Sequence, residues 1–102
     1  MGKLTIEELK TALKRLPDWH LAKDREAIAR RFEFVDFDAA FAFMARVALL
    51  AAKMDHHPEW FNVYNKLDVT LATHDEKGVT QKDIELATAM DGFAALMSGG
   101  TS

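Results

Sequence analysis

Apolar residues recur along this chain with two different periods, and the periods mark out its elements. A capping box of Thr5 and Glu8 opens a stretch with helical spacing that ends before Pro17. Residues 19–23 and 27–35 then alternate between apolar and polar with the two-residue period of a strand. The first third of the chain therefore predicts a helix followed by two strands.

The same two periods continue through the middle of the chain. Either Asp36 or Asp38 can cap a helix that runs to about Met54. Two more strands are expected at residues 61–64 and 67–73, where apolar and polar residues again alternate. A helix is thus followed by a second pair of strands.

A last helix completes the pattern after a loop at residues 75–78. Residues 80–83 cap it, and its predicted inner face consists of Ile84, Ala87, Met90, Phe93, Ala94 and Met97. The tail at 98–102 is expected to fray. The order α-β-β-α-β-β-α predicts an α+β fold, a four-stranded antiparallel sheet with helices packed on one face, as one domain over residues 1–102.

The helix predicted at residues 38–54 is apolar around most of its circumference. Only Arg46 and Lys53 interrupt it with a polar stripe. A helix of this kind has to be covered on more than one side. In a chain this short the sheet can cover one side and another subunit the other, so we expect this helix to form an oligomer interface.

Composition narrows the class of protein. The chain has 102 residues, of which 49% are hydrophobic and 28% charged, as in a globular domain. A net charge of −3 offers no basic surface for nucleic acid, and no apolar run is long enough to cross a membrane. With no cysteine and no signal-like N-terminus, we expect a cytoplasmic protein whose chemistry depends on histidine and carboxylate groups.

Three of the four histidines lie in two short pieces, 55–64 and 73–75. Pro58 disfavours the helical conformation for His57, so the adjacent pair His56 and His57 should lie on an irregular turn where both can face one cavity. His74 follows the last predicted strand. We therefore expect the two pieces to meet at one end of the sheet.

Three interpretations of these histidines remain open. They can be surface or half-buried residues held by local hydrogen bonds. They can form an open zinc site, although adjacent histidines are poorly spaced to bind one ion. They can also perform acid–base chemistry on a bound heterocycle, since histidine titrates near neutral pH. In that case Trp60 and Tyr64 would form a stacking wall, although core packing is the commoner role of an aromatic residue.

The residues 55–64, together with Leu71, Thr73, His74, Asp75, Gly78, Thr80 and Asp83, closely resemble the pterin-4a-carbinolamine dehydratase family. The resemblance covers nearly the whole chain and implies the same α-β-β-α-β-β-α fold. Members of the family form dimers and tetramers, and their central helices make a bundle. It therefore implies a homodimer or homotetramer, formed through the 38–54 helix and a sheet edge.

The resemblance also implies an activity without metal or cofactor. The family is a group of carbon–oxygen lyases that remove water from 4a-hydroxytetrahydrobiopterin-type carbinolamines, leaving quinonoid dihydropterin for tetrahydrobiopterin recycling. His56 and His74 match its acid–base residues, and His57 matches a histidine that holds the substrate. The positions implied to contact the pterin are Asp55, His56, His57, Trp60, Ala72, Thr73, His74, Asp75 and Asp83. For Asp83, support of a histidine and capping of the last helix are both open.

One position departs from the family pattern. Many relatives carry glutamate where this chain has Ala52, one turn before the histidine pair. A carboxylate there could tune a histidine and fix its tautomer, so its absence predicts slower catalysis or a compensating role for Asp55. The alternative function is a non-catalytic module for dimerisation and protein binding, because animal relatives stabilise dimers of a transcription factor.

Overall fold

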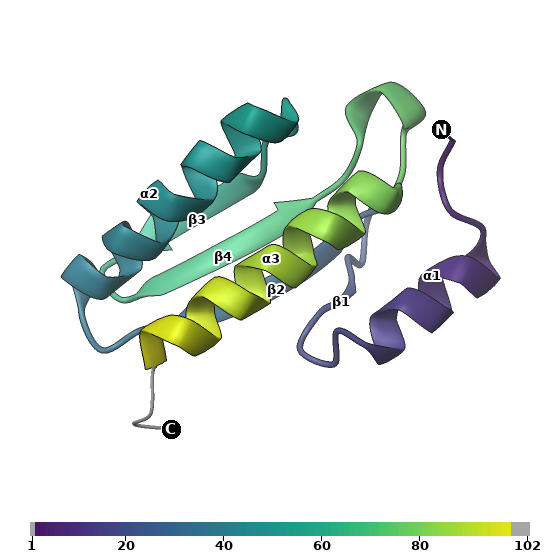
Figure 1. The fold of residues 1–102 in the computed structure, drawn as a ribbon. Coiled ribbons are helices and arrows are strands. Elements are labelled where there is room, and N and C mark those ends of the chain that lie inside the picture. Colours follow the sequence, from purple (N-terminus) through teal and green to yellow (C-terminus); the bar gives the residue numbers. More distant parts are fainter. Residues whose placement is uncertain (1, 99–102) are drawn as a thin grey trace.

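The computed structural model describes residues 2–98 and confirms the predicted α+β order (Figure 1). Its elements are α1 (Ile6–Lys14), β1 (His20–Leu21), β2 (Ile28–Glu33), α2 (Phe37–Met54), β3 (Glu59–Val63), β4 (Lys66–Leu71), the 3₁₀ helix η1 (His74–Glu76) and α3 (Gln81–Ser98). The tail predicted to fray lies, from residue 99 on, outside the described residues.

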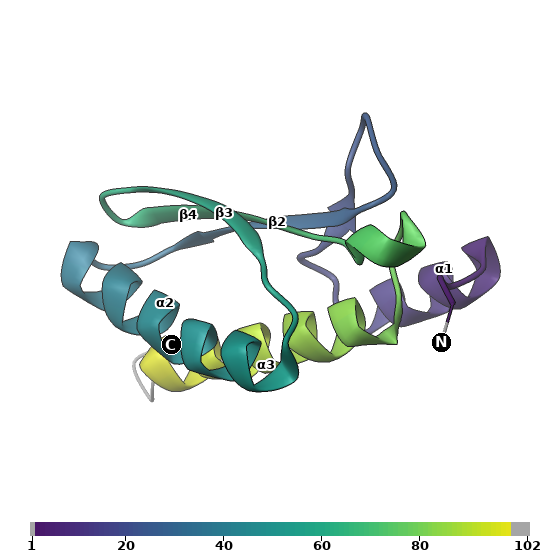
Figure 2. The same cartoon turned by 90° about the horizontal axis from the view of Figure 1, so that it is seen from above.

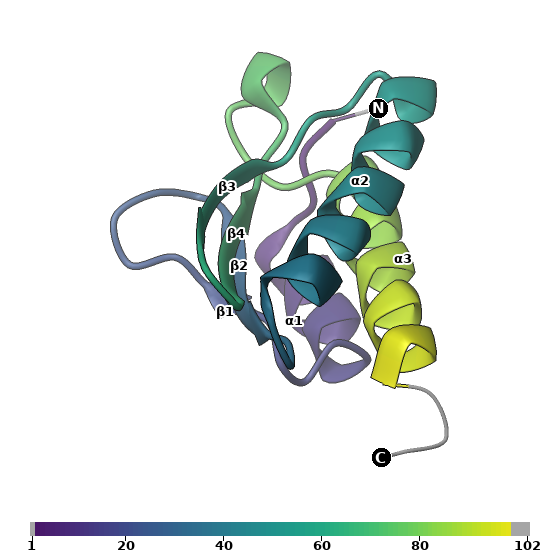
Figure 3. The same ribbon diagram turned by 90° about the vertical axis from the view of Figure 1, so that its left-hand side faces the viewer.

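The four strands form one antiparallel sheet in the order β1-β2-β4-β3. β4 lies in the interior and pairs along its length with β2 and β3, whereas β1 contributes only two residues. All three α-helices cover the same face of the sheet, as the side views show (Figures 2 and 3). The predicted arrangement of sheet and helices is therefore confirmed.

The core lies between that face and the helices. Alternation buries Leu67, Val69 and Leu71 of β4, and their cross-strand partners in β2 include Ile28 and Phe32. The helices add Ala40, Phe43, Val47 and Ala51 from α2 and Leu86, Ala87 and Met90 from α3. Met97, predicted on the inner face of α3, is instead 37% exposed, because it lies near the end of the helix.

Asp36 is the N-cap of α2 and accepts a hydrogen bond from the Ala39 amide at 2.9 Å. Within the chain, only one stripe of this helix is buried. The side chains of Phe37, Phe41 and Leu49 remain 43%, 57% and 75% exposed. Part of its apolar surface is thus left uncovered by the other elements of the chain. Across residues 2–98, no helix combines the length and apolar character needed to cross a membrane.

The end of β4 differs from the prediction. The strand ends at Leu71 and not at Thr73, and residues predicted as a loop form η1. Thr73 makes an isolated bridge to Gly78, with its amide donating to the Gly78 carbonyl at 2.8 Å. The short helical turn closed by this bridge sets where His74 leaves the sheet.

Candidate active site

The C-terminus of α2 determines how the histidine pair is presented. Asp55 adopts the left-handed conformation with φ of 52°, and its amide donates to the Ala52 carbonyl at 3.2 Å. The His56 amide donates to the Ala51 carbonyl at 3.0 Å, which completes a Schellman motif. The helix therefore stops abruptly, and the residues from His56 to Pro58 form the irregular connection to β3.

A cavity of about 350 Å³ opens beside this connection. Its lining comes from the end of α2, the segment after β4 and the first turn of α3: Asp55, His56, His57, Ala72, Thr73, His74, Asp75 and Lys82. The two histidine-containing pieces thus meet at one end of the sheet, as their places in the sequence predicted.

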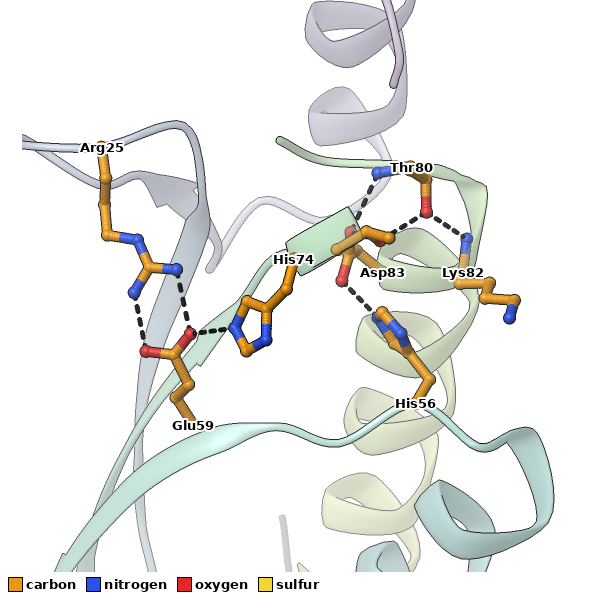
Figure 4. Close-up of polar contacts among 8 residues, drawn as sticks. Arg25, His56, Glu59, His74, Thr80, Lys82 and Asp83 are labelled. Carbon is orange, nitrogen blue, oxygen red and sulfur yellow. Dashed lines mark hydrogen bonds and ion pairs between the residues drawn. The ribbon is translucent and has the colours of Figure 1, made fainter. Parts of the chain in front are cut away.

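His56 lies at the buried side of the cavity and is held by a carboxylate from α3 (Figure 4). Its Nε2 is 2.6 Å from Oδ1 of Asp83. Oδ2 of the same carboxylate accepts from the Thr73 hydroxyl at 2.8 Å and from the Thr80 amide at 2.9 Å. Asp83 therefore both supports a histidine and caps α3, so the two roles left open by the sequence occur together.

His74 occupies the exposed side, where its side chain is 72% exposed. Its Nε2 is 3.1 Å from Oε2 of Glu59, the first residue of β3. Arg25, in the loop between β1 and β2, donates to both oxygens of Glu59 at 2.6 and 2.9 Å. The hydrogen bonds from Arg25 and then from His74 lower the pKa of Glu59 to about 2, so this carboxylate is ionised at neutral pH.

Two aromatic residues proposed as a stacking wall lie elsewhere. Trp60 pairs with Val69 on the helix-facing side of the sheet and packs against the core, so it does not line the cavity. Tyr64, 61% exposed, lies in the turn between β3 and β4, at the opposite end of β3 from the histidine pair. The alternation of β3 explains Trp60, since its neighbour Glu59 takes the outer face.

Ala52 is exposed in the last turn of α2 and does not line the cavity. The carboxylate beside His56 is instead that of Asp83.

The site also includes residues that the sequence did not indicate. Lys82 lines the cavity, and Glu59 with Arg25 holds His74. Glu59 follows Pro58 directly, and strand alternation starting there would have placed it on the outer face. No sequence signal links Arg25 to it, because the two residues are 34 positions apart.

The open zinc interpretation finds no support in the described part of the chain. Among residues 2–98, no group of three or more histidine, cysteine, aspartate or glutamate side chains is arranged to hold a metal ion. His56 and His74 each pair with a single carboxylate instead.

The family model described as pterin 4 alpha carbinolamine dehydratase matches residues 2–93. The chain belongs to the pterin-4-alpha-carbinolamine dehydratase family. The resemblance seen in the sequence is thereby confirmed, and it extends over the cavity and every residue that lines it.

Two bacterial proteins illustrate how similar members of this dehydratase family are. A protein of Burkholderia cenocepacia (strain HI2424), provisionally named pterin-4-alpha-carbinolamine dehydratase, is 59% identical over 93 residues, which cover 91% of each chain. A protein of Rhodopseudomonas palustris (strain BisB18) with the same provisional name is 58% identical over 96 residues, covering 94% of this chain and 95% of the relative.

A solved structure shares the fold of this dehydratase family member. The crystal structure described as transcriptional coactivator/pterin dehydratase from Brucella melitensis superposes with a TM-score of 0.90 at 54% sequence identity. The match covers 92% of this chain and all of the Brucella chain. The fold is thus that of a protein described both as an enzyme and as a coactivator.

Proposed function

We propose that this protein is a 4a-hydroxytetrahydropterin dehydratase. It would convert the pterin carbinolamine left by aromatic amino-acid hydroxylases into quinonoid dihydropterin and water, for tetrahydrobiopterin recycling in the cytoplasm. Membership of the family supports the reaction class. The observation that carries the proposal is the cavity at the end of the sheet, where His56, His57 and His74 come together.

The reaction needs one proton donor and one proton acceptor. The C4a–O bond breaks, the N5 lone pair forms a C4a=N5 double bond, the hydroxyl takes up a proton and leaves as water, and N5 gives up its proton. No redox change occurs. A histidine near neutral pH can supply or accept each of these protons. His56 and His74, on opposite sides of the cavity, are the proposed acid–base pair, and His57 holds the substrate.

The remaining lining fits a small polar heterocycle. A volume of about 350 Å³ lies within the range of small-ligand pockets. Asp55 and Asp75 provide carboxylates that accept hydrogen bonds from ring N–H and amino groups. Ala72 and Thr73 line the cavity just beyond the end of β4, and the backbone groups of Thr73 are already hydrogen-bonded to Gly78 and Glu76.

A rate assay tests this proposal. The purified protein should accelerate the decay of 4a-hydroxytetrahydropterin absorbance, and the double variant His56→Ala/His74→Ala should abolish the acceleration. His20→Ala is the matched control, because His20 lies in β1 and does not line the cavity. Unchanged activity in the double variant would refute the assigned roles. A catalytically silent wild-type protein would favour the alternative, a protein-binding module such as the Brucella relative's description as a coactivator suggests.

We further propose that the chain forms a homodimer or homotetramer through the 38–54 helix and a sheet edge. The exposed side chains of Phe37, Phe41 and Leu49 on α2 support the helical contact. β3 supports the sheet contact, because it is an edge strand with exposed Phe61 and Val63. Exposed apolar groups gathered in this way usually mark an interaction surface.

Light scattering at micromolar concentration tests the assembly. We expect a dimer or tetramer for the wild-type protein and a smaller species for Leu49→Glu, whose side chain is 75% exposed and therefore outside the core. Lys10→Glu, a charge reversal on the exposed surface of α1, should leave the mass unchanged. A monomeric wild-type protein would rule out the proposed interface.

A further inference from the structure

The chain presents its two proposed acid–base histidines in the same way. In each ring Nε2 meets a carboxylate, Asp83 for His56 and Glu59 for His74. Both histidines line the cavity, and within residues 2–98 neither uses its second ring nitrogen, Nδ1, in a hydrogen bond. Figure 4 shows the ring of His74 with Glu59 on one side and His56 on the other. Neither carboxylate lines the cavity: Asp83 is fully buried, whereas the Glu59 side chain is 41% exposed and reaches the cavity only through His74.

Glu59 is itself held in place from two directions. Its backbone pairs with Thr70 in the sheet, and its carboxylate receives two hydrogen bonds from Arg25. A planar guanidinium that grips both carboxylate oxygens fixes their orientation as well as their position. The carboxylate is ionised at neutral pH, so it can only accept hydrogen bonds. The Nε2 atom of His74 must therefore carry a proton whenever it bonds to Glu59.

The hydrogen bond to Glu59 also restrains an otherwise open side chain. His74 is 72% exposed, and within residues 2–98 its ring makes no other hydrogen bond. A ring left without this contact would sample other rotamers and lose the alignment that proton transfer needs. His56 has no such requirement, because it is buried against α3.

We propose that Glu59, clamped by Arg25, is the positioning residue for His74: it holds the proton on Nε2 and aims Nδ1 at the substrate. Nδ1 is then the atom that exchanges a proton with the pterin. This inference rests on the proposed dehydratase activity and adds a role for two residues outside the cavity lining.

The variant Glu59→Gln tests this role, with Asp68→Asn as the matched control. Asp68 is also an outer-face carboxylate gripped through two hydrogen bonds by an arginine, Arg31, and the two carboxylate side chains are 46% and 41% exposed. Glutamine keeps the shape but can turn an N–H donor toward the ring. Whenever that N–H group faces the ring, Nε2 accepts and the proton moves to Nδ1; when the amide oxygen faces the ring, His74 has to share it with Arg25.

Two readouts separate positioning from general destabilisation. The first is the tautomer of His74, read from imidazole ¹⁵N chemical shifts in the substrate-free protein and assigned with a His74→Gln spectrum. We expect the Nε2–H form in the wild-type protein and in Asp68→Asn, and a population of the Nδ1–H form in Glu59→Gln. The second is kcat, which should fall about tenfold in Glu59→Gln with little change in KM. This is less than the full contribution of a general acid–base group, because His74 is still present but no longer held in position.

The outcomes are distinguishable. An unchanged His74 tautomer together with an unchanged kcat in Glu59→Gln, or an equal loss of kcat in Asp68→Asn, would overturn the role of Glu59 while leaving the dehydratase activity in place. A wild-type protein without dehydratase activity would overturn the proposed function, and the positioning role with it.

Discussion

Replacing Asp83 by asparagine probes the buried half of the site with the smallest change in shape. One oxygen of Asp83 contacts Nε2 of His56, and the other accepts from the Thr73 hydroxyl and the Thr80 amide. The Thr80 amide can only donate, so the asparagine oxygen must stay on that side. Its NH₂ group then faces His56, and Nε2 has to become an acceptor.

The expected loss follows from that reversal. The proton of neutral His56 moves from Nε2 to Nδ1, so the nitrogen that faces away from residue 83 no longer offers a lone pair. Protonating Nε2 would break its bond to the amide. The variant thus loses the contribution of one general acid–base group, about 10²–10⁴-fold in kcat. The fully buried, charge-assisted hydrogen bond is lost as well, which we expect to lower the free energy of unfolding by about 1–2 kcal/mol.

Two measurements on two variants check this reasoning. Stopped-flow decay of 4a-hydroxytetrahydropterin gives kcat, and urea unfolding gives stability. Asp91→Asn is the control, because Asp91 also lies on α3 and accepts from Trp19 and Arg30 at 2.9 and 2.6 Å but does not line the cavity. It should lose stability and keep kcat. A normal kcat in Asp83→Asn, or an equal fall in both variants, would refute the tautomer argument.

Three further predictions concern neighbouring residues. Asp55→Gly should raise the free energy of unfolding by about 0.5–1 kcal/mol, because glycine adopts the left-handed backbone conformation without strain. The same variant should raise KM, because Asp55 lines the cavity, and a lower urea midpoint would contradict the first expectation. The pKa of Glu59, lowered from 4.5 to about 2, predicts stability that is present above pH 4.5 and lost as the pH falls toward 2. Since the Glu59 side chain is 41% exposed, solvent screening should limit this contribution to the free energy of unfolding to about 1 kcal/mol. Between pH 4.5 and 2, Glu59→Gln should therefore lose about that much less stability than the wild-type protein. Trp60→Phe should lower the free energy of unfolding by about 1–2 kcal/mol without changing KM. A raised KM at normal stability would instead indicate that Trp60 contacts the substrate.

Much of the fold was predictable because its signals are local. Thr5 with Glu8 starts α1, Asp36 starts α2, and alternation marks the strands, each within a few residues of the observed bounds. The turn at Pro58 was predictable for the same reason, since the restriction on His57 acts between adjacent residues. The 3₁₀ helix η1 was not, because it depends on the bridge between Thr73 and Gly78.

The sequence by itself determined the element order, the capped helices and the turn that carries the histidine pair, because these depend on contacts between near neighbours along the chain. Only the tertiary structure decided which carboxylate meets which histidine. Asp83 reaches His56 across 27 positions, and Arg25 reaches Glu59 across 34. Such pairings depend on how α3 and the β1–β2 loop pack around the end of the sheet. That packing also brought His74 within hydrogen-bonding distance of Glu59.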